Sequence, residues 1–203
     1  MSWWESAYRS GSVNWDPGEY DRHLPWLLST FDIAPCRAID LGCGTGKSAV
    51  WLAEHGFDVV GVDLAPTAIR NANELARVRG VSATFVAGEF PGEFTAGRRS
   101  SVLGSEPFGL AIERGFLQHF GPGRELDRVL RAVVDLLAPD ALFYSLITAR
   151  EGKRARWGPR LWSESEVRES LGAWFRIRHM ELSVFTPDEA GSMPAWLTVM
   201  DLG

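Results

Sequence analysis

The alternation of apolar and polar positions predicts a strand, a glycine turn, a helix and a second strand between residues 37 and 64. A short apolar run ends at Gly42, and apolar residues then recur at helical spacing from Lys47 to His55. Gly56 is placed to end this helix, and the run 58–63 is typical of a strand buried on both faces. A βαβ unit of this kind is parallel and right-handed, with a ligand crevice at the carboxyl ends of its strands.

The same reasoning predicts alternating helices and strands along the rest of the chain. We expect helices at 20–31, 66–79, 122–137 and 163–173, a helical turn at 116–120, a turn at 139–141, and strands at 81–87, 108–112, 141–148, 176–185 and 195–202. The fold class is α/β: a Rossmann-like, seven-stranded, mostly parallel sheet with helices on both faces and a C-terminal antiparallel strand pair. We expect one domain over residues 1–203, with an aromatic N-terminal segment (1–35) and a core (36–203).

Composition places the chain among ordinary globular proteins and excludes several classes. Of its 203 residues, 45% are hydrophobic and 23% charged, and no run of 18 apolar residues predicts a membrane span. The N-terminus lacks the basic and apolar regions of a secretory signal. Two cysteines, Cys36 and Cys43, are too few for a disulfide framework or a metal set, so we expect both to be reduced and the protein to be cytoplasmic.

Charge argues against a nucleic-acid partner. The net charge of −5 is unfavourable for binding nucleic acid, and we expect neither a nucleic-acid nor a membrane partner. The four histidines show no ligand spacing, so no metal site is expected. A basic stretch at 150–160 either recruits an anionic substrate or is a solvated loop. The oligomeric state stays open.

The glycine turn has two lookalikes that its spacing argues against. Gly44–Ser48 resembles the end of a phosphate-binding P-loop, but the position that should hold its first glycine is Leu41. A nicotinamide fingerprint reads GxGxxG, whereas the spacing here is GxGxG. An acid, Asp40, precedes the turn, and Asp63 ends the second strand, where an acid can accept both hydroxyls of a ribose. A turn used only for packing is the remaining alternative.

The pattern DxGxGxG followed by a strand-ending Asp resembles the S-adenosylmethionine (SAM) site of the class I methyltransferases. This resemblance implies SAM as the cofactor, with Asp40 at the methionine end and Asp63 on the ribose. It also implies that the acid at Glu89, or the adjacent backbone, meets the adenine amino group, although Glu89 could be only a solvated turn residue. The cofactor-binding residues implied in this part of the chain are Asp40, Gly42, Gly44, Gly46, Asp63, Leu64, Glu89 and Phe90.

The N-terminal segment is rich in aromatic residues ahead of the first core strand. Trp4, Tyr8, Gly11 and Trp15 form the pattern WxxxYxxGxxxW, which resembles the N-terminal segment of thiopurine S-methyltransferases and related thiol methyltransferases. In that family the three aromatic positions line the SAM pocket, and the one matching Trp15 also faces the methyl acceptor. The segment is therefore interpreted as a lid over the cofactor, the alternative being aromatic padding of the sheet.

The predicted fourth strand ends in Glu113-Arg114-Gly115, which resembles the Asp-Arg-Gly of the thiopurine-type enzymes. We place Glu113 and Arg114 in the cofactor site, with Arg114 on the methionine carboxylate or on an anionic acceptor, unless it only pairs with Glu113. His119 is a candidate general base for a hydroxyl or amine acceptor, or a packing residue. The reaction implied is methyl transfer to a sulfur, oxygen or nitrogen nucleophile of a small-molecule acceptor, with sulfur favoured. A SAM-binding protein without turnover and a NAD-binding dehydrogenase are the alternatives.

Overall fold

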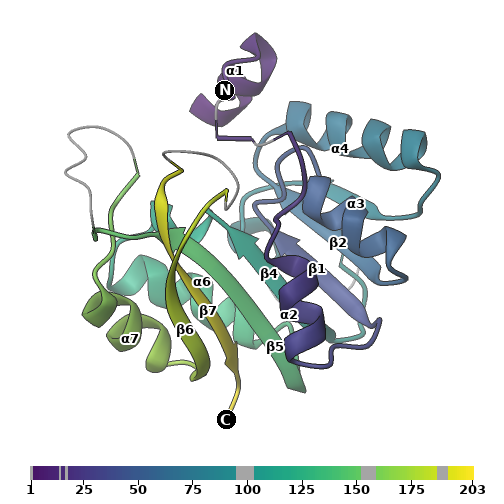
Figure 1. Ribbon diagram of the computed structural model, residues 1–203. Coiled ribbons are helices and arrows are strands. Elements are labelled where there is room, and N and C mark those ends of the chain that lie inside the picture. The colour runs from purple at the N-terminus through teal and green to yellow at the C-terminus, as the bar shows by residue number, and fades with distance from the viewer. Residues whose placement is uncertain (1, 14, 17, 95–102, 152–158, 187–191) are drawn as a thin grey trace. The chain divides into compact units, whose positions relative to one another are not determined.

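The computed structural model describes residues 2–13, 15, 16, 18–94, 103–151, 159–186 and 192–203, and Figure 1 shows its helices and strands. Contacts divide the chain into two compact units, residues 1–108 and 109–203. Residues 95–102 of the predicted loop at 91–107, and Lys153, Arg154 and Arg156 of the basic stretch, lie outside the described residues.

The first unit is built on three parallel strands in the order β3-β2-β1. Its elements are α1 (Trp3–Ser10), α2 (Leu24–Thr30), β1 (Arg37–Leu41), α3 (Lys47–Glu54), β2 (Asp58–Asp63), α4 (Pro66–Arg79), β3 (Thr84–Ala87) and the short 3₁₀ helix η1 (Gly92–Phe94). The central strand β2 buries Val59, Val60 and Val62, and both α3 and α4 pack on it. This unit therefore contains the predicted strand, turn, helix and strand at the expected places.

The second unit carries the antiparallel end of the sheet. Its elements are β4 (Phe108–Arg114), the 3₁₀ helix η2 (Leu117–His119), α6 (Arg124–Val134), β5 (Leu137–Thr148), α7 (Glu164–Gly172), β6 (Arg176–Val184) and β7 (Pro194–Asp201). β7 runs antiparallel to both β5 and β6. Helix α6 is strongly amphipathic and buries Leu126, Val129, Leu130 and Val133.

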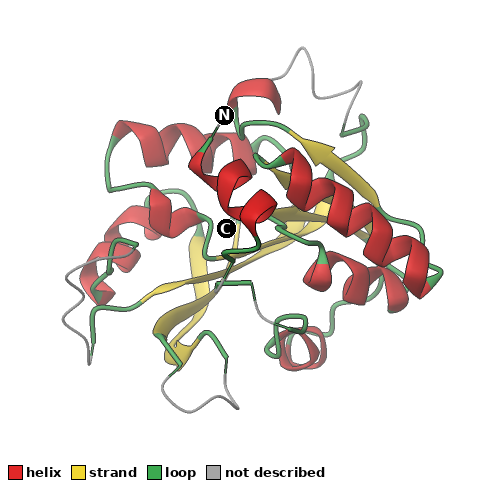
Figure 2. Cartoon of the chain, turned by 90° about the horizontal axis from the view of Figure 1, so that it is seen from above, coloured by secondary structure: helices red, strands yellow, loops and turns green. Residues whose placement is uncertain are grey.

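The strand order across the sheet is β3-β2-β1-β4-β5-β7-β6. The predicted class, a seven-stranded mixed sheet with helices and C-terminal antiparallel strands, is confirmed. The alternation of helices and strands can be followed along the chain in Figure 1 and, coloured by type, in Figure 2. No helix among the described residues is long and apolar enough to cross a membrane.

The predicted starts of α2 and β5 are wrong for identifiable reasons. Helix α2 begins at Leu24 and not near residue 20, because the Asp21 carboxylate accepts hydrogen bonds from the backbone N–H and Nδ1 of His23 and so forms a local turn; Pro25 then occupies the first helical turn. The turn expected at 139–141 lies inside β5. Pairing with β7 starts only at Phe143, and Pro139 is exposed in the part of the strand that precedes this pairing.

Candidate active site

The glycine turn between β1 and α3 is held by its own backbone. The Gly42 and Cys43 N–H groups both donate to the Val62 carbonyl, at 2.9 and 3.0 Å, and the Gly46 N–H donates to the Cys43 carbonyl at 2.9 Å. Gly46 has φ of +78°, and a Cβ there would lie 2.7 Å from the Cβ of Ala72 on α4. Close packing of the turn against the helix therefore requires a glycine at this position.

Asp63, at the end of β2, binds the turn directly. Its Oδ2 accepts from the Gly44 N–H at 2.9 Å, and its Oδ1 accepts from the Ala65 N–H at 2.8 Å. Burial raises the pKa of this carboxyl, while the two backbone N–H groups act in the opposite direction and nearby Asp16 adds to the rise. Each oxygen keeps a further lone pair, so the carboxylate can still accept hydroxyl groups. The predicted ribose contact stays a prediction.

The other residues predicted around the turn differ in exposure. Asp40 is buried at the end of β1, and Leu64, after β2, is 41% exposed. At the end of β3, Glu89 is exposed, and its N–H donates to Glu93 Oε1 at 3.2 Å. Phe90 is buried and packs against Phe94 with ring centroids 6.0 Å apart. The acid of the predicted adenine site therefore faces solvent, and its apolar neighbour is part of the core.

The N-terminal aromatic residues gather at the glycine turn. Trp15 contacts Trp4 and Tyr8 edge to face, with ring centroids 5.4 and 6.1 Å apart. A Cβ on Gly44 would lie 2.8 Å from the Tyr8 hydroxyl, so this ring covers the turn itself. Burial, and then the nearby Asp63, raise the pKa of Tyr8. Trp4, Tyr8 and Trp15 therefore lie together, as their pattern predicted. That they form a lid over the cofactor stays a prediction.

Two carboxylates of the N-terminal segment, which the sequence analysis did not single out, bind this segment to the glycine turn and to α4. Asp16 accepts from Thr45 Oγ1 and from Lys47 Nζ, both at 2.8 Å. Glu5 accepts from the Thr67 N–H at 2.9 Å and from Thr67 Oγ1 at 2.7 Å, and so caps the N-terminus of α4. These partners are 29 to 62 residues apart in the chain, and no local pattern signals them.

In the second unit, Glu113 is fully buried at the end of β4. Its Oε2 accepts from the N–H groups of Phe116 and Leu117, at 2.9 and 3.1 Å, and the Ser145 hydroxyl donates to Oε1. Burial raises the pKa of Glu113 to about 7, although these donors act against it. The carboxyl group thus holds the turn that leads into η2, a role for which the Asp-Arg-Gly resemblance gave no indication.

Arg114 and His119 flank this turn. Arg114 donates from NH2 to the Phe185 carbonyl at 2.8 Å, and its guanidinium lies 5.1 Å from the centroid of the Phe185 ring. Its Nε is buried and has no hydrogen-bond partner among the described residues. His119 as a whole residue is exposed, but neighbouring groups partly bury its imidazole, and this burial lowers its pKa. A hydrogen bond to the Gly115 backbone acts in the opposite direction. A neutral imidazole is the form that a general base requires.

A Rossmann-like sheet whose glycine turn is bound by a strand-ending carboxylate defines an α/β protein with its ligand site at the carboxyl ends of the strands. The family model described as a methyltransferase domain matches residues 39–143, just over half of the chain. The chain belongs to the methyltransferase-domain family.

Individual relatives agree with this assignment at low identity. A 2-heptyl-1-hydroxyquinolin-4(1H)-one methyltransferase of Mycobacteroides abscessus is 30% identical over 143 residues, which cover 68% of this chain and 58% of the relative. A probable thiol methyltransferase of Arabidopsis thaliana is 32% identical over 71 residues, 35% of this chain and 31% of the relative. The chain thus matches less than two thirds of the length of each of these relatives.

A solved structure shows the same fold. The Burkholderia thailandensis 1,6-didemethyltoxoflavin-N1-methyltransferase, with bound 1,6-didemethyltoxoflavin and S-adenosylhomocysteine, superimposes with a TM-score of 0.73. The match covers 98% of this chain and 85% of that chain, at 24% sequence identity.

Proposed function

We propose that the protein transfers a methyl group from SAM to a small-molecule acceptor. The observation that carries this proposal is the pairing of the glycine turn: the N–H groups of Gly42, Cys43, Gly44 and Gly46 all donate to acceptors within the protein. A dinucleotide or triphosphate site needs such N–H groups free for its phosphates. SAM carries an amino acid and a ribose but no phosphate, so a turn closed in this way suits it better than NAD or ATP.

The residues of the first unit have distinct roles in this proposal. Asp63 accepts the two ribose hydroxyls with its free lone pairs, Asp40 and the turn hold the methionine end, and the end of β3 (Glu89 and Phe90) meets the adenine. Trp4, Tyr8 and Trp15 cover the site and exclude water. SAM supplies a methyl group on a sulfonium, which is already a good leaving group, so alignment and exclusion of water are the main tasks of the chain.

The second unit provides the groups proposed for the acceptor. Arg114 offers a cationic donor, and His119 in its neutral form can take a proton from a hydroxyl or an amine. A thiolate acceptor would need no base. Sulfur acceptors are favoured by the N-terminal pattern and by the thiol methyltransferase relative; the hydroxyquinolone and toxoflavin relatives keep oxygen and nitrogen acceptors as the second choice. Since neither Cys36 nor Cys43 forms a disulfide and the net charge is −5, we propose a cytoplasmic reaction without a nucleic-acid partner.

A ligand panel tests this function. SAM and S-adenosylhomocysteine should raise the melting temperature of the protein, and NAD and ATP should not. Release of S-adenosylhomocysteine is then measured with thiol, hydroxyl and amine acceptors. Stabilisation by NAD alone would refute the proposal in favour of a dehydrogenase. Tight SAM binding without any methyl transfer across the panel would identify a SAM-binding protein without turnover.

A further inference from the structure

The side chain of Gln118, the only glutamine of the chain, binds a backbone group of β5. The residue is 9% exposed, and its Oε1 accepts from the Thr148 N–H at 3.1 Å. Main-chain pairing along this edge of β5 ends where the Gly115 N–H donates to the Leu146 carbonyl at 2.9 Å. The amide oxygen of Gln118 therefore pairs the next N–H of the strand, which would otherwise be buried without a partner.

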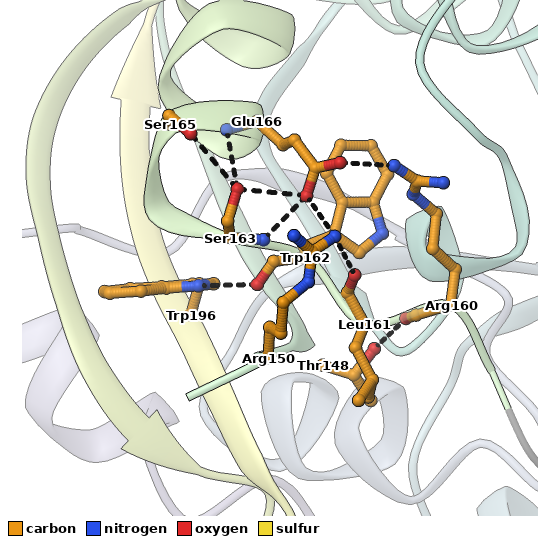
Figure 3. Close-up of polar contacts among 9 residues, drawn as sticks. All are labelled: Thr148, Arg150, Arg160, Leu161, Trp162, Ser163, Ser165, Glu166 and Trp196. Carbon is orange, nitrogen blue, oxygen red and sulfur yellow. Dashed lines mark hydrogen bonds and ion pairs between the residues drawn. The ribbon is translucent and has the colours of Figure 1, made fainter. Parts of the chain in front are cut away.

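Thr148 is itself held at its other polar groups. Its carbonyl accepts from the Trp162 N–H at 3.0 Å, and its hydroxyl donates to the Arg160 carbonyl, as Figure 3 shows. The Arg160 side chain donates in turn to Glu166, in the first turn of α7. Because a backbone N–H can bond only to an acceptor, the oxygen of Gln118 must face Thr148, and this fixes the orientation of the amide group.

The amide nitrogen of Gln118 lies beside the turn that follows β4. A Cβ on Gly115, which has φ of +80°, would lie 3.3 Å from Gln118 Nε2 and 3.5 Å from Phe185 Cε1. The amide nitrogen and the Phe185 ring therefore border the same point of the backbone. The nitrogen offers two N–H groups and no lone pair, and no acceptor for these groups lies among the described residues.

Phe185, which the sequence analysis did not single out, also contacts Arg114. Its carbonyl accepts from Arg114 Nη2 at 2.8 Å, and its ring centroid lies 5.1 Å from the guanidinium. Nε of Arg114 is buried and has no partner among the described residues, which calls for an explanation because such a donor destabilises the folded state. Two side chains with unused donors, Gln118 and Arg114, thus border one aromatic ring. They lie where β4 ends, at the edge at which α/β sheets bind their ligands.

The donors and the ring together indicate the kind of ligand. Amide and guanidinium N–H groups only donate, so the ligand must supply lone pairs. Glu113, the acid next to Arg114 in the chain, does not supply them, because its oxygens accept from two backbone N–H groups and from the Ser145 hydroxyl. The Phe185 ring favours contact with another flat, conjugated group. A carbonyl attached to a planar ring combines both properties.

We propose that Gln118 Nε2 and the Arg114 guanidinium bind a carbonyl oxygen of the methyl acceptor, and that this acceptor is a planar ring compound whose ring lies against Phe185. The inference rests on the proposed function, which it deepens by assigning a class of acceptor. It applies equally to a sulfur, an oxygen or a nitrogen nucleophile on that ring. Gln118 and Phe185 are then specificity-determining residues, and Thr148 positions the amide.

NMR of the side-chain amide tests the proposal directly. Because the chain has one glutamine, labelling with side-chain nitrogen-15 glutamine gives a single pair of amide protons, those of Gln118. The probes are 1-isoquinolone and 1-aminoisoquinoline, which share a ring system and differ in a carbonyl against an amino group, each added with saturating S-adenosylhomocysteine. We expect isoquinolone to shift an amide proton downfield, because a proton in a hydrogen bond is deshielded, and aminoisoquinoline to leave the pair in place. A pair that isoquinolone does not move, or an equal response to both probes, overturns the proposal.

Affinity measurements on variants separate the two ends of the amide. Gln118→Glu keeps an oxygen for the Thr148 N–H but replaces the amide nitrogen, and it should weaken isoquinolone binding by about tenfold, the effect of one hydrogen bond. Phe185→Leu should also weaken binding, because the flat contact surface is lost. Asn73→Asp is the matched control: it makes the same change from amide to acid on α4, at a side chain whose Nδ2 donates to the Ile69 carbonyl at 2.9 Å. An unchanged affinity in Gln118→Glu, or an equal loss in Asn73→Asp, contradicts the proposal.

SAM calorimetry on the same samples distinguishes this inference from the proposed function. Intact SAM binding with an unresponsive Gln118 amide refutes only the acceptor site. Absence of SAM binding in the wild type refutes the proposed function, whatever isoquinolone does. If Gln118→Glu fails to fold, the wild-type titration with the two probes and the affinity of Phe185→Leu still decide the question.

Discussion

Replacing Glu113 with glutamine should remove a loss in the free energy of unfolding that the wild type shows as the pH rises. The carboxyl group is fully buried and accepts from two backbone N–H groups and the Ser145 hydroxyl. These donors favour the charged form, but burial outweighs them and raises the pKa to about 7, from 4.5 for an unperturbed glutamate. Glutamine keeps the shape of the side chain and one acceptor oxygen without the charge.

The sign and size of the effect follow from this shift. Between about pH 4.5 and pH 7 the folded state binds a proton at Glu113 that the unfolded state has lost, so the free energy of unfolding falls as pH rises through this window. The difference of roughly 2.5 pKa units corresponds to about 3 kcal/mol. The variant Glu113→Gln lacks this loss, and its stability relative to the wild type should rise by about 3 kcal/mol from pH 4.5 to pH 8.

Urea unfolding followed by tryptophan fluorescence measures this difference at a series of pH values. Comparing the two proteins at each pH cancels the contributions of all other titrating groups. Ser145→Ala is the companion variant: it removes a donor that lowers the pKa of Glu113, so its own loss of stability should extend to higher pH. If wild type and Glu113→Gln give parallel curves from pH 4.5 to pH 8, the buried carboxyl group does not titrate in this window and the reasoning is refuted.

Three further predictions concern the candidate site. Asp63→Ala should weaken SAM binding by about 2–4 kcal/mol in calorimetry, whereas Asp58→Ala, at the exposed start of the same strand, should not; equal affinities would remove Asp63 from the site. Gly44→Ala adds a Cβ 2.8 Å from the Tyr8 hydroxyl at φ +54° and should lower the free energy of unfolding by about 1–3 kcal/mol. Tyr8→Phe should recover part of this loss in a double-mutant cycle, and strict additivity would exclude the clash. With a hydroxyl or amine acceptor, His119→Gln should reduce kcat by about 10²–10⁴-fold, and a change under about threefold means that it is not the base.

The sequence predicted the elements whose residues carry their own signals. The unit from β1 to β2 combines a buried apolar run, a helical period and glycines at the turns, and all three signals are local. The predicted starts of α2 and β5 were both wrong. A local turn, in which Asp21 binds His23, delays the start of α2, and β5 begins at Leu137, before the stretch that pairs with β7.

The candidate site likewise contains residues that the sequence predicted and residues that it missed. The closeness of Tyr8 and Trp15 followed from a resemblance that residue spacing alone would not have supplied. The carboxylates Asp16 and Glu5 were missed because each binds a partner 29 or more residues away.

The positions that resemble a P-loop have another use in this chain. Lys47, which would bind a phosphate in a P-loop, donates to Asp16, and the hydroxyl of Ser48 accepts from the Asp21 N–H at 3.1 Å. Both side chains therefore hold the N-terminal segment against the turn. The N–H groups of Gly42, Cys43, Gly44 and Gly46 are paired as well, so they offer no donors to a phosphate. This arrangement disfavours phosphates and favours a ligand with hydroxyl and ammonium donors, which is the polar chemistry of SAM.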